Sequence, residues 1–364
     1  MSSIHCTTCY SPYPSDALPY RCAKCGGMYG YREFPAYDPA QVDPSQPSMW
    51  KYRHAFGLPP HVDATTLGEG DTTLTWADVK GRKIAFKQEY DNPSGSQKDR
   101  GVSLLVSWLK SMGVKQAVED SSGNAGASFA TYAQKFGIQS RIFIPDAASG
   151  PKRQQIDATG AQVIRILGRR SVVAEAVQRA AGGEVVYASH AYLPHLLPGY
   201  ATISYELVEQ METPPKTVIA PVGHGSLLLG VAEGFRSLKR AGVIDTLPHL
   251  IGVQALNCAP LWAAFTHGMD GLSMVTEGET VAEGVRVLSP LAGDALMQAV
   301  ANSGGRFIAV PEDDILPGRD QLHQIGFNVE PTSALVWHAL QQVLGRVPEP
   351  IAVLLTGAGW KSTV

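Results

Sequence analysis

The sequence predicts an α/β protein with parallel sheets in two domains, preceded by a short segment of paired cysteines. Short apolar runs alternate with stretches of helical periodicity from about residue 80 onward. Repeated strand–helix units of this kind are typical of parallel sheets that helices cover on both faces. The 364 residues suffice for about two domains at roughly 150 residues each. Four cysteines gather in the first 25 residues as two Cys-x2-Cys pairs.

The composition is that of an ordinary globular chain. Apolar residues make up 44% and charged residues 17%, and the formal net charge is −3. This charge argues against a large nucleic-acid-binding surface, and no apolar run is long enough to span a membrane. The first residues, MSSIHCTTC, lack the basic and apolar regions of a secretory signal. We therefore expect a cytoplasmic protein whose five cysteines stay reduced.

Residues 1–33 are predicted to form a zinc-ribbon-like segment. Each pair, Cys6 with Cys9 and Cys22 with Cys25, can place two thiolates on one turn, and two such turns close a tetrahedral zinc site. Chance clustering, or a ribbon that no longer binds metal, is the alternative. The fifth cysteine, Cys258, stands alone in an apolar stretch and is expected to be a small buried side chain.

The remaining elements follow from composition and periodicity. Residues 34–62 are rich in Pro, Tyr, Asp and Ser, which predicts a connector rather than a packed element. Strands are expected at residues 83–90, 116–120, 140–145, 161–167, 184–189, 217–222, 249–256, 307–310 and 351–356. Helices are expected at residues 99–113, 124–136, 150–160 and 171–181, after Gly225, and at 331–344.

Ligands of such folds bind in loops at the carboxyl ends of strands, and a lysine stands in one of these loops. Lys98 follows a Ser/Gly-rich turn, within YDNPSGSQKDRG, and immediately precedes a predicted helix. Cationic neighbours, a helix N-terminus or desolvation would each lower the pKa of its amine and make it a nucleophile. A surface lysine in a solvated loop is the alternative.

Three further loops carry unusual chemistry. In DSSGNAGAS (120–128), hydroxyls and backbone N–H groups of 121–123 can hold a carboxylate, whereas a simple helix cap would explain only one serine. PVGHGSLLLG (221–230) suits an anion, but it lacks the Lys-Ser/Thr of a P-loop. In LLTGAGWK (354–361), Thr356 stands where a buried heterocycle nitrogen could meet it, or else in a plain terminal turn. Together with Lys98, these loops fit pyridoxal 5′-phosphate.

The motifs, in this order, resemble those of the fold-type II pyridoxal-phosphate enzymes, the tryptophan synthase β-subunit-like group. Within that group the chain is most similar to the threonine synthases. NPSGSQKDRG is similar to their NPTGSFKDRG, SSGNAGAS to their asparagine loop, PVGHGSLLLG to their phosphate loop, and VEPTSA (329–334) and TGAGWK to their late segments. The resemblance covers nearly all of residues 66–361, and some members also have an N-terminal cysteine ribbon.

The resemblance implies a domain organisation and a role for each site residue. It implies a large cofactor-binding domain of residues 34–90 and 205–364, and a smaller mobile α/β domain of residues 91–204. Lys98 would be the Schiff-base lysine and proton shuttle, Asn124 would bind the cofactor's phenolic oxygen, and Thr356 would face its pyridine nitrogen. The phosphate would be held by Gly223, His224, Gly225, Ser226 and Leu227. The substrate carboxylate would be held by Ser121, Ser122 and Gly123.

The sequence also departs from the threonine synthases. Ala125 and Gly126 stand where a threonine and a small residue are usual, and Gln97 replaces an aromatic residue. SHAYLPHLLPGYAT (189–202) has no arginine, although the corresponding family segment contacts the phosphorylated substrate through one. His190, His195 or Arg153 could replace it. ETVAEGVRV (279–287) resembles a run of the serine and threonine dehydratases, and its Glu283 either approaches the site or begins a surface helix.

These observations predict a pyridoxal-phosphate-dependent β/γ-elimination or replacement on a small amino acid, with conversion of O-phosphohomoserine to threonine and phosphate as the leading activity. An ammonia-lyase or β-replacement synthase with a non-phosphorylated substrate is the alternative. Two hypotheses come from other classes. One is a non-catalytic cofactor-binding regulator. The other is a zinc-ribbon protein acting through nucleic acid, for which the ribbon offers only Arg21, Lys24 and Arg32. The resemblance implies a homodimer.

Overall fold

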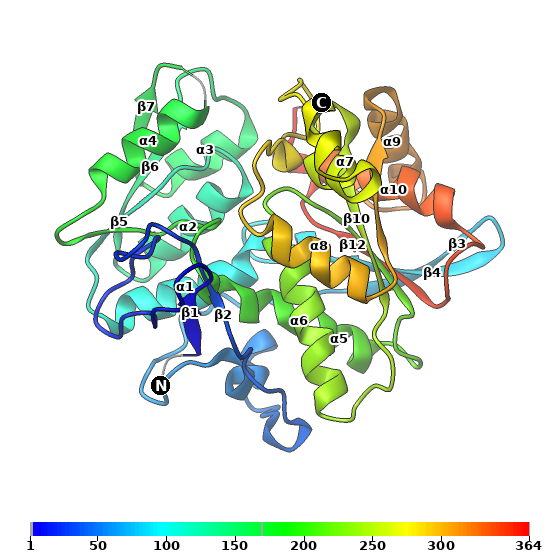
Figure 1. Cartoon of the computed structure of the whole chain (residues 1–364), viewed down its shortest axis with the longest axis horizontal. Coiled ribbons are helices and arrows are strands. Elements are labelled where there is room, and N and C mark those ends of the chain that lie inside the picture. Colours follow the sequence, from blue (N-terminus) through cyan, green and yellow to red (C-terminus); the bar gives the residue numbers. More distant parts are fainter. Residues whose placement is uncertain (1–2, 169, 364) are drawn as a thin grey trace. The chain divides into compact units, whose positions relative to one another are not determined.

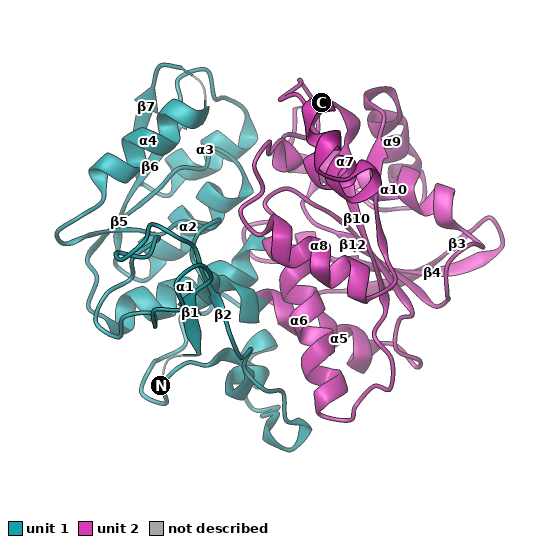
Figure 2. Cartoon of the chain, viewed as in Figure 1, with its two compact units in different colours: residues 1–69, 98–199 teal, residues 70–97, 200–364 magenta. Residues whose placement is uncertain are grey.

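The computed structural model describes residues 3–168 and 170–363, and Figure 1 shows its helices and strands. The chain divides into two compact units, which Figure 2 distinguishes by colour. The first unit is drawn from residues 1–69 and 98–199, and the second from residues 70–97 and 200–364. Residues 34–69 thus belong to the first unit, whereas the sequence suggested the larger domain for them. The expected mobility of the smaller domain stays a prediction.

A four-stranded parallel sheet forms the centre of the first unit. Its strand order is β7-β6-β5-β8, and every neighbouring pair is parallel. The chain runs from β5 outward to β6 and β7, and then returns to place β8 on the other side of β5. The strands are β5 (Gln116–Glu119), β6 (Gln139–Pro145), β7 (Gln162–Ile166) and β8 (Val185–Tyr187). The helices are α1 (Lys98–Ser111), α2 (Asn124–Lys135), α3 (Pro151–Ala158) and α4 (Arg170–Ala180).

A six-stranded sheet forms the centre of the second unit, in the order β11-β10-β9-β12-β4-β3. All pairs are parallel except the β3–β4 hairpin. Here the chain runs from β9 to β10 and β11 and then returns to insert β12 between β9 and β4. The strands are β3 (Leu74–Val79), β4 (Arg82–Gln88), β9 (Thr217–Pro221), β10 (His249–Ala255), β11 (Arg306–Val310) and β12 (Ile351–Leu355).

Helix α10 (Pro331–Val343) packs on this sheet and contributes Leu335 and Leu340 to an apolar core that includes side chains of the sheet. All five residues of β12 are buried, as expected for an interior strand of a parallel sheet covered on both faces. The other helices of the second half are α5 (Leu197–Gln210), α6 (Ser226–Arg240), α7 (Pro260–His267), α8 (Gly293–Asn302) and α9 (Ile315–Gln324). None of the helices described combines the length and apolar character needed to cross a membrane.

The structure contains every strand and helix expected between residues 83 and 356. The sequence did not indicate β3, α5, α7, α8 or α9, nor the short pair β1 (Ile4–Cys6) and β2 (Tyr29–Tyr31). The expectation of an unpacked connector at 34–62 is wrong. A 3-10 helix, Ser48–Phe56, buries Trp50 and Tyr52, and the Trp50 indole N–H donates to Glu69 Oε1 at 2.8 Å. Proline and aspartate mark turns there, but the aromatic side chains still bury their area.

A fully buried ion pair fixes α5 to the second sheet. Lys87 on β4 and Glu206 on α5 have no exposed side-chain surface, and Lys87 Nζ lies 2.6 Å from Glu206 Oε2. The ammonium also donates to the Thr72 carbonyl at 2.7 Å and to Gln210 Oε1 at 2.8 Å. Glu206 Oε1 accepts the Asp71 N–H at 2.9 Å. Each charge is therefore both paired and hydrogen bonded, which is what burial of a charge requires.

Replacing Lys87 by Met should lower the free energy of unfolding by about 3–5 kcal/mol, because the carboxylate of Glu206 would stay buried without its cation. Urea unfolding followed by tryptophan fluorescence measures the change. Lys83→Met, at the exposed start of the same strand, is the matched control and should unfold close to wild type. Equal stability of the two variants would show that the buried pair contributes nothing.

Candidate functional site

Each sheet has one switch point, where the returning strand lies beside the strand that began the series. In parallel sheets, ligands bind outside the carboxyl ends of the strands at this point. In the first unit these are β5 and β8, followed by the 121–124 loop and by His190. In the second unit they are β9 and β12, followed by the 223–227 loop and by Thr356. The predicted site residues other than Lys98 and the cysteines therefore follow the strands that flank the switch points.

Lys98 is the first residue of α1, and the loop before it is firmly held within the second unit. The Gln97 N–H donates to the Thr356 carbonyl at 3.0 Å, and the Ala358 N–H donates to the Gly95 carbonyl at 3.1 Å. The buried ammonium of Lys361 donates to the Ser94 carbonyl at 2.6 Å. Gly95 has a φ of +83°, and a Cβ there would lie 2.6 Å from the Trp360 ring. The turn after β12 thus fixes the residue that precedes Lys98.

The 223–227 loop has the backbone of an anion site. Gly225 is the N-cap of α6 and has a φ of +97°, a conformation that favours glycine. A Cβ on Gly223 would lie 2.8 Å from the Gly284 carbonyl oxygen, so this close approach also requires glycine. The first N–H groups of α6 have no acceptor within the helix, and the helix dipole places positive charge there. These features fit a phosphate group.

The 279–287 segment packs against the 223–227 loop, because Gly284 lies in close contact with Gly223. Gly284 itself is fixed by Thr332, whose hydroxyl accepts the Gly284 N–H at 3.1 Å. Glu283 is exposed in the 3-10 turn Glu283–Val285. Of the two interpretations of Glu283, the structure therefore favours the surface turn.

The hydrogen bonds that Ser333 accepts leave the Thr356 hydroxyl to act as a donor toward a different partner. The Ser333 Oγ accepts the Thr356 N–H at 2.9 Å and the Gly357 N–H at 2.8 Å. A hydroxyl has two lone pairs and one hydrogen, so Ser333 can only donate to its remaining neighbours, Thr356 Oγ1 at 3.0 Å or the Gly357 carbonyl at 3.2 Å. The Thr356 hydrogen must consequently point away from Ser333. Ser333 lies in the VEPTSA motif, where the sequence pattern alone indicates no role for it.

The 121–124 loop lies against the first turn of α2, which begins at Asn124. A Cβ on Gly126 would lie 1.8 Å from the Ser121 carbonyl oxygen, so α2 packs on the loop at backbone contact. The Gly123 N–H donates to Ser121 Oγ at 3.2 Å, and the Ser121 N–H donates to Glu119 Oε2 at 2.6 Å. The Ser121 N–H is therefore engaged by a carboxylate of the protein, which the sequence analysis did not foresee.

Three buried titratable groups meet beside this loop: Glu119, Asp120 and His190. The Nδ1 of His190 is hydrogen bonded to Glu119 Oε1, and the Tyr187 hydroxyl donates to Asp120 Oδ1 at 2.8 Å. Burial raises the pKa of the Glu119 carboxyl to about 7 and also raises the pKa of Asp120. Burial, and then the charge of Lys98, lower the pKa of His190 to about 3. The sequence does contain a sign of this cluster, because two acidic residues, Glu119 and Asp120, stand at the end of an apolar strand.

The three residues that could replace the missing arginine have different surroundings in the structure. His195 is a core residue, because its ring lies 4.9 Å from that of Tyr13 and 5.2 Å from that of Trp108, and burial lowers its pKa to about 3. Arg153 pairs with Asp157 one turn along α3, at 3.0 Å. His190 alone of the three directly follows a strand at the switch point.

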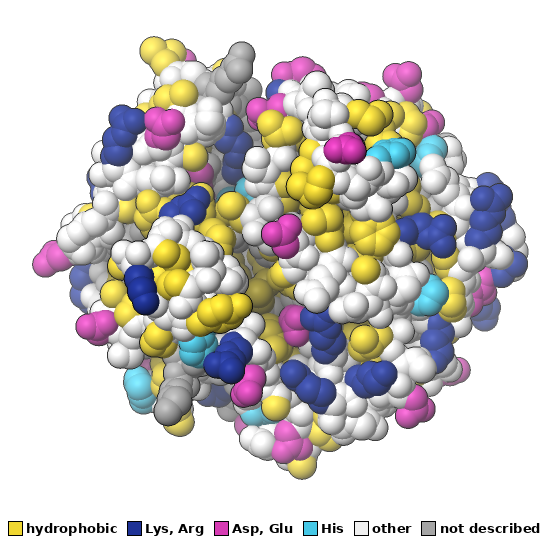
Figure 3. All heavy atoms as spheres, in the orientation of Figure 1, with side chains coloured by type: hydrophobic (Ala, Val, Ile, Leu, Met, Phe, Trp, Pro, Cys, Tyr) yellow, Lys and Arg dark blue, Asp and Glu magenta, His cyan; other side chains and the backbone are white. Residues whose placement is uncertain are grey.

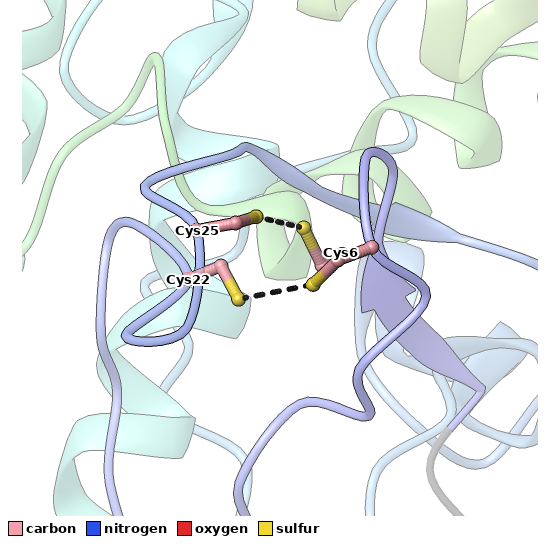
Figure 4. A group of neighbouring side chains, drawn as sticks. Cys6, Cys22 and Cys25 are labelled. Carbon is pink, nitrogen blue, oxygen red and sulfur yellow. Dashed lines mark hydrogen bonds between the residues drawn. The ribbon is translucent and has the colours of Figure 1, made fainter.

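The four N-terminal cysteines form two turns of the same geometry. The residue after each pair, Tyr10 or Gly26, has a left-handed φ of 59° or 73°. Its N–H donates to the carbonyl of the first cysteine of the pair, at 3.0 Å for Cys6 and 2.8 Å for Cys22. The two turns face each other across the cluster drawn in Figure 4.

The cysteine cluster fits a tetrahedral metal site. Cys6 Sγ lies 3.5 Å from Cys25 Sγ, Cys9 Sγ lies 3.7 Å from Cys22 Sγ, and all four sulfurs lie within 4.8 Å of one another. Zinc–sulfur bonds of about 2.3 Å at tetrahedral angles require sulfurs about 3.8 Å apart. Cys258 is free and fully buried, which confirms the expectation for it.

Comparisons with known proteins agree with this geometry. Residues 65–357 match the family model described as "Pyridoxal-phosphate dependent enzyme". The chain is 30% identical to the threonine synthase of Methanosarcina acetivorans, over 98% of this chain and 91% of that protein. It is 29% identical to the threonine synthase of Methanocaldococcus jannaschii, over 98% and 92%. A solved L-serine ammonia-lyase from Rhizomucor miehei, 21% identical, superposes with a TM-score of 0.69 over 80% of this chain and 94% of that chain.

The packing of α2 on the 121–124 loop predicts opposite tolerances for two neighbouring glycines. Gly126→Ala should destabilise the protein by about 1–3 kcal/mol, because its Cβ would displace the Ser121 carbonyl. Gly123→Ala should melt close to wild type, because its Cβ would meet only Ser121 Oγ, at 3.7 Å, and its φ is −104°. Thermal unfolding of both variants measures the difference. A Gly126→Ala protein as stable as Gly123→Ala would contradict the close packing.

Proposed function

Because the chain belongs to the pyridoxal-phosphate-dependent enzyme family and is a lyase of that family, we propose that it catalyses β/γ-elimination or replacement on a small amino acid. The leading substrate is O-phosphohomoserine, converted to threonine and phosphate. The observation that carries this proposal is the placement of three of the candidate loops after strands at the two switch points, with the fourth, the Lys98 loop, hydrogen bonded to one of them. The names of the threonine synthase relatives support the choice of substrate.

The residues present fit the cofactor. Backbone N–H groups at the N-terminus of α6, behind Gly223 and Gly225, would hold its phosphate. The Thr356 hydroxyl, kept as a donor by Ser333, would meet a ring nitrogen that carries no proton. Asn124, the first residue of α2, would hold the phenolic oxygen. When bound, pyridoxal phosphate supplies an electron sink for a carbanion at the substrate Cα.

The protein's own groups would bind the substrate and move its protons. Hydroxyls and N–H groups of Ser121, Ser122 and Gly123 would orient the substrate carboxylate. Because the Ser121 N–H is held by Glu119, the hydroxyls and the remaining N–H groups of this loop would form those bonds. The amine of Lys98 would take the proton from Cα and later return it. Held at the start of α1, this amine would act on only one face of the substrate.

A specific observation favours a second candidate, elimination from an unphosphorylated hydroxy amino acid, or β-replacement on one. Segment 189–202 supplies no arginine, and its His190 is instead bonded to Glu119, beside the second carboxyl of Asp120. In their ionised forms, two carboxyl groups near the substrate would repel a phosphate dianion, whereas a hydroxyl carries no charge to repel. The arrangement therefore supports an ammonia-lyase or a β-replacement synthase with a non-phosphorylated substrate as the second candidate.

Zinc and a homodimer are further parts of the proposal. Cys6, Cys9, Cys22 and Cys25 would hold one structural zinc ion, which the sulfur spacing supports. Large apolar side chains exposed on the 3-10 helix Met269–Met274, chiefly Met269 and Met274, support burial against a second copy of the chain. On the face drawn in Figure 3, cationic and anionic side chains are interspersed, which supports the expectation that nucleic acid is not the partner.

The purified protein should show a visible absorption band of bound cofactor that Lys98→Ala abolishes or shifts, because the variant lacks the amine that attaches the cofactor. Adding O-phosphohomoserine, serine and threonine in turn should perturb the wild-type band with the true substrate only. Lys110→Ala, at the exposed end of the same helix, is the control and should keep the band.

The outcomes separate the candidate functions. Phosphate release from O-phosphohomoserine would establish the leading activity, and ammonia or 2-keto acid from serine or threonine the second. A band that no amino acid perturbs would point to a non-catalytic regulator. A protein without any band, even after addition of cofactor, would refute the proposal.

Metal analysis of the protein should give one zinc per chain, and Cys22→Ser should lower this ratio, because three thiolates hold zinc more weakly than four. Cys258→Ser, a buried cysteine outside the cluster, should retain the metal. Zinc content that is equal in both variants, or absent in wild type, would show that the cluster does not bind it.

A further inference from the structure

The pairing of Glu119 and His190 has no part in the roles assigned so far. Glu119 is the last residue of β5, and His190 follows β8, so the parallel pairing of β5 with β8 brings them together at the switch point of the first unit. The Glu119 side chain is 1% exposed and that of His190 10%. A carboxyl and an imidazole this deeply buried, at the edge where a ligand is expected, are unusual for a purely structural pair.

The contacts of Glu119 fix the orientation of both groups. Its Oε2 accepts the Ser121 N–H at 2.6 Å, and its Oε1 accepts the His190 backbone N–H at 3.3 Å and is bonded to Nδ1 of the ring. The imidazole is thereby held through Nδ1, with Nε2 as the ring nitrogen opposite Glu119. This is the arrangement in which a third group orients a histidine for proton transfer.

The pair also lies close to both groups that would handle the substrate. Glu119 contacts the Ser121–Gly123 loop directly. The charge of Lys98 acts on the imidazole and helps to lower the pKa of His190. The start of α1 is bound to α2 through Asp99 Oδ1, which accepts the Ser128 hydroxyl at 2.5 Å. A substrate held between Lys98 and the loop would therefore have its side chain near His190.

We propose that Glu119 and His190 form a second proton-transfer pair, which protonates the oxygen that leaves from Cβ or Cγ of the substrate; this inference rests on the proposed elimination chemistry. In the acid form, the Glu119 carboxylic acid donates to Nδ1, and Nε2 carries the other ring hydrogen. When the carbon–oxygen bond breaks, its electron pair goes to the oxygen, which takes the Nε2 hydrogen. Glu119 gives its proton to Nδ1 in the same event and becomes a carboxylate.

Because the ring gains one hydrogen as it loses the other, the imidazole stays neutral throughout. Its surroundings favour the neutral form. A cationic His190 is disfavoured by burial, by Lys98 and by Arg170, which outweigh the attraction of Asp120. The titrating proton belongs to Glu119 instead, whose pKa is raised to about 7 by burial against the opposing effects of nearby N–H groups and Arg170. Asp120 stays apart from the exchange, because it accepts the Tyr187 hydroxyl. The acid form is thus present below about pH 7 and lost above it.

The pair is tested by separating the two proton transfers in the cofactor-loaded enzyme. Exchange of the substrate α-hydrogen with deuterated solvent, followed by NMR, requires Lys98 alone, whereas product release also requires the pair. Glu119→Gln keeps an acceptor for the Ser121 N–H but has no proton to give. We expect it and His190→Asn to retain exchange within a few-fold and to lose product formation by roughly 10²–10⁴-fold. Glu175→Gln, on the exposed face of α4, should leave both rates unchanged.

A readout independent of turnover is the infrared C=O stretch of a protonated carboxyl. Wild type should show such a band that titrates near neutral pH and is missing in Glu119→Gln. The decline of product formation above about pH 7 should vanish with it. Equal losses of exchange and product formation in Glu119→Gln, no loss at all, or an unchanged infrared titration would each overturn the inference. Absence of exchange in wild type would instead reject the proposed function.

Discussion

The rest of the structure depends on one topological constraint, the return of a late strand to the open side of an early one. β8 returns beside β5, and β12 returns between β9 and β4. At these two places the connections leave the sheet in opposite directions, and in parallel sheets this is where ligands bind, outside the carboxyl ends of the strands. Every feature assigned to chemistry, except the cysteine cluster, lies in these loops or is fixed by them. Lys98 is placed this way, because the turn after β12 holds the residue before it.

The two units contribute different chemistry to this arrangement. The second unit offers neutral donors: the backbone N–H groups behind Gly225 and the hydroxyl of Thr356, whose hydrogen is directed by Ser333. These groups suit recognition of an anion and a heterocycle, and they do not change with pH. The first unit offers groups whose pKa values are shifted by burial, among them Glu119 and His190. These titratable groups therefore lie in the first unit, together with the Ser121–Gly123 loop and Asn124 that would bind ligands.

The sequence predicted the elements well because the strands are either continuous apolar runs or follow clear turns. β12, with all five residues buried, is an example. Glycines, serines and a lysine that follow strands in a recognisable order also indicated candidate loops, and the roles of these loops stay predictions. It could not show that Glu119 meets His190, 71 residues away, because that contact depends on strand order and not on local pattern. The burial of Trp50 was not predicted for a related reason. The residues around it are typical of turns, and the local pattern does not show its buried hydrogen-bond partner, Glu69.

The central place of β12 has a consequence for how the chain is made. Residues 351–355 are synthesised after the other five strands of this sheet, yet they separate β9 from β4 in the finished sheet. Until they emerge, the larger unit consists of two partial sheets with unpaired edges, which are the surfaces most prone to wrong association. The same few residues also complete the support of the segment before Lys98. A chain that ends before these residues therefore lacks both the completed sheet and the support of the segment before Lys98.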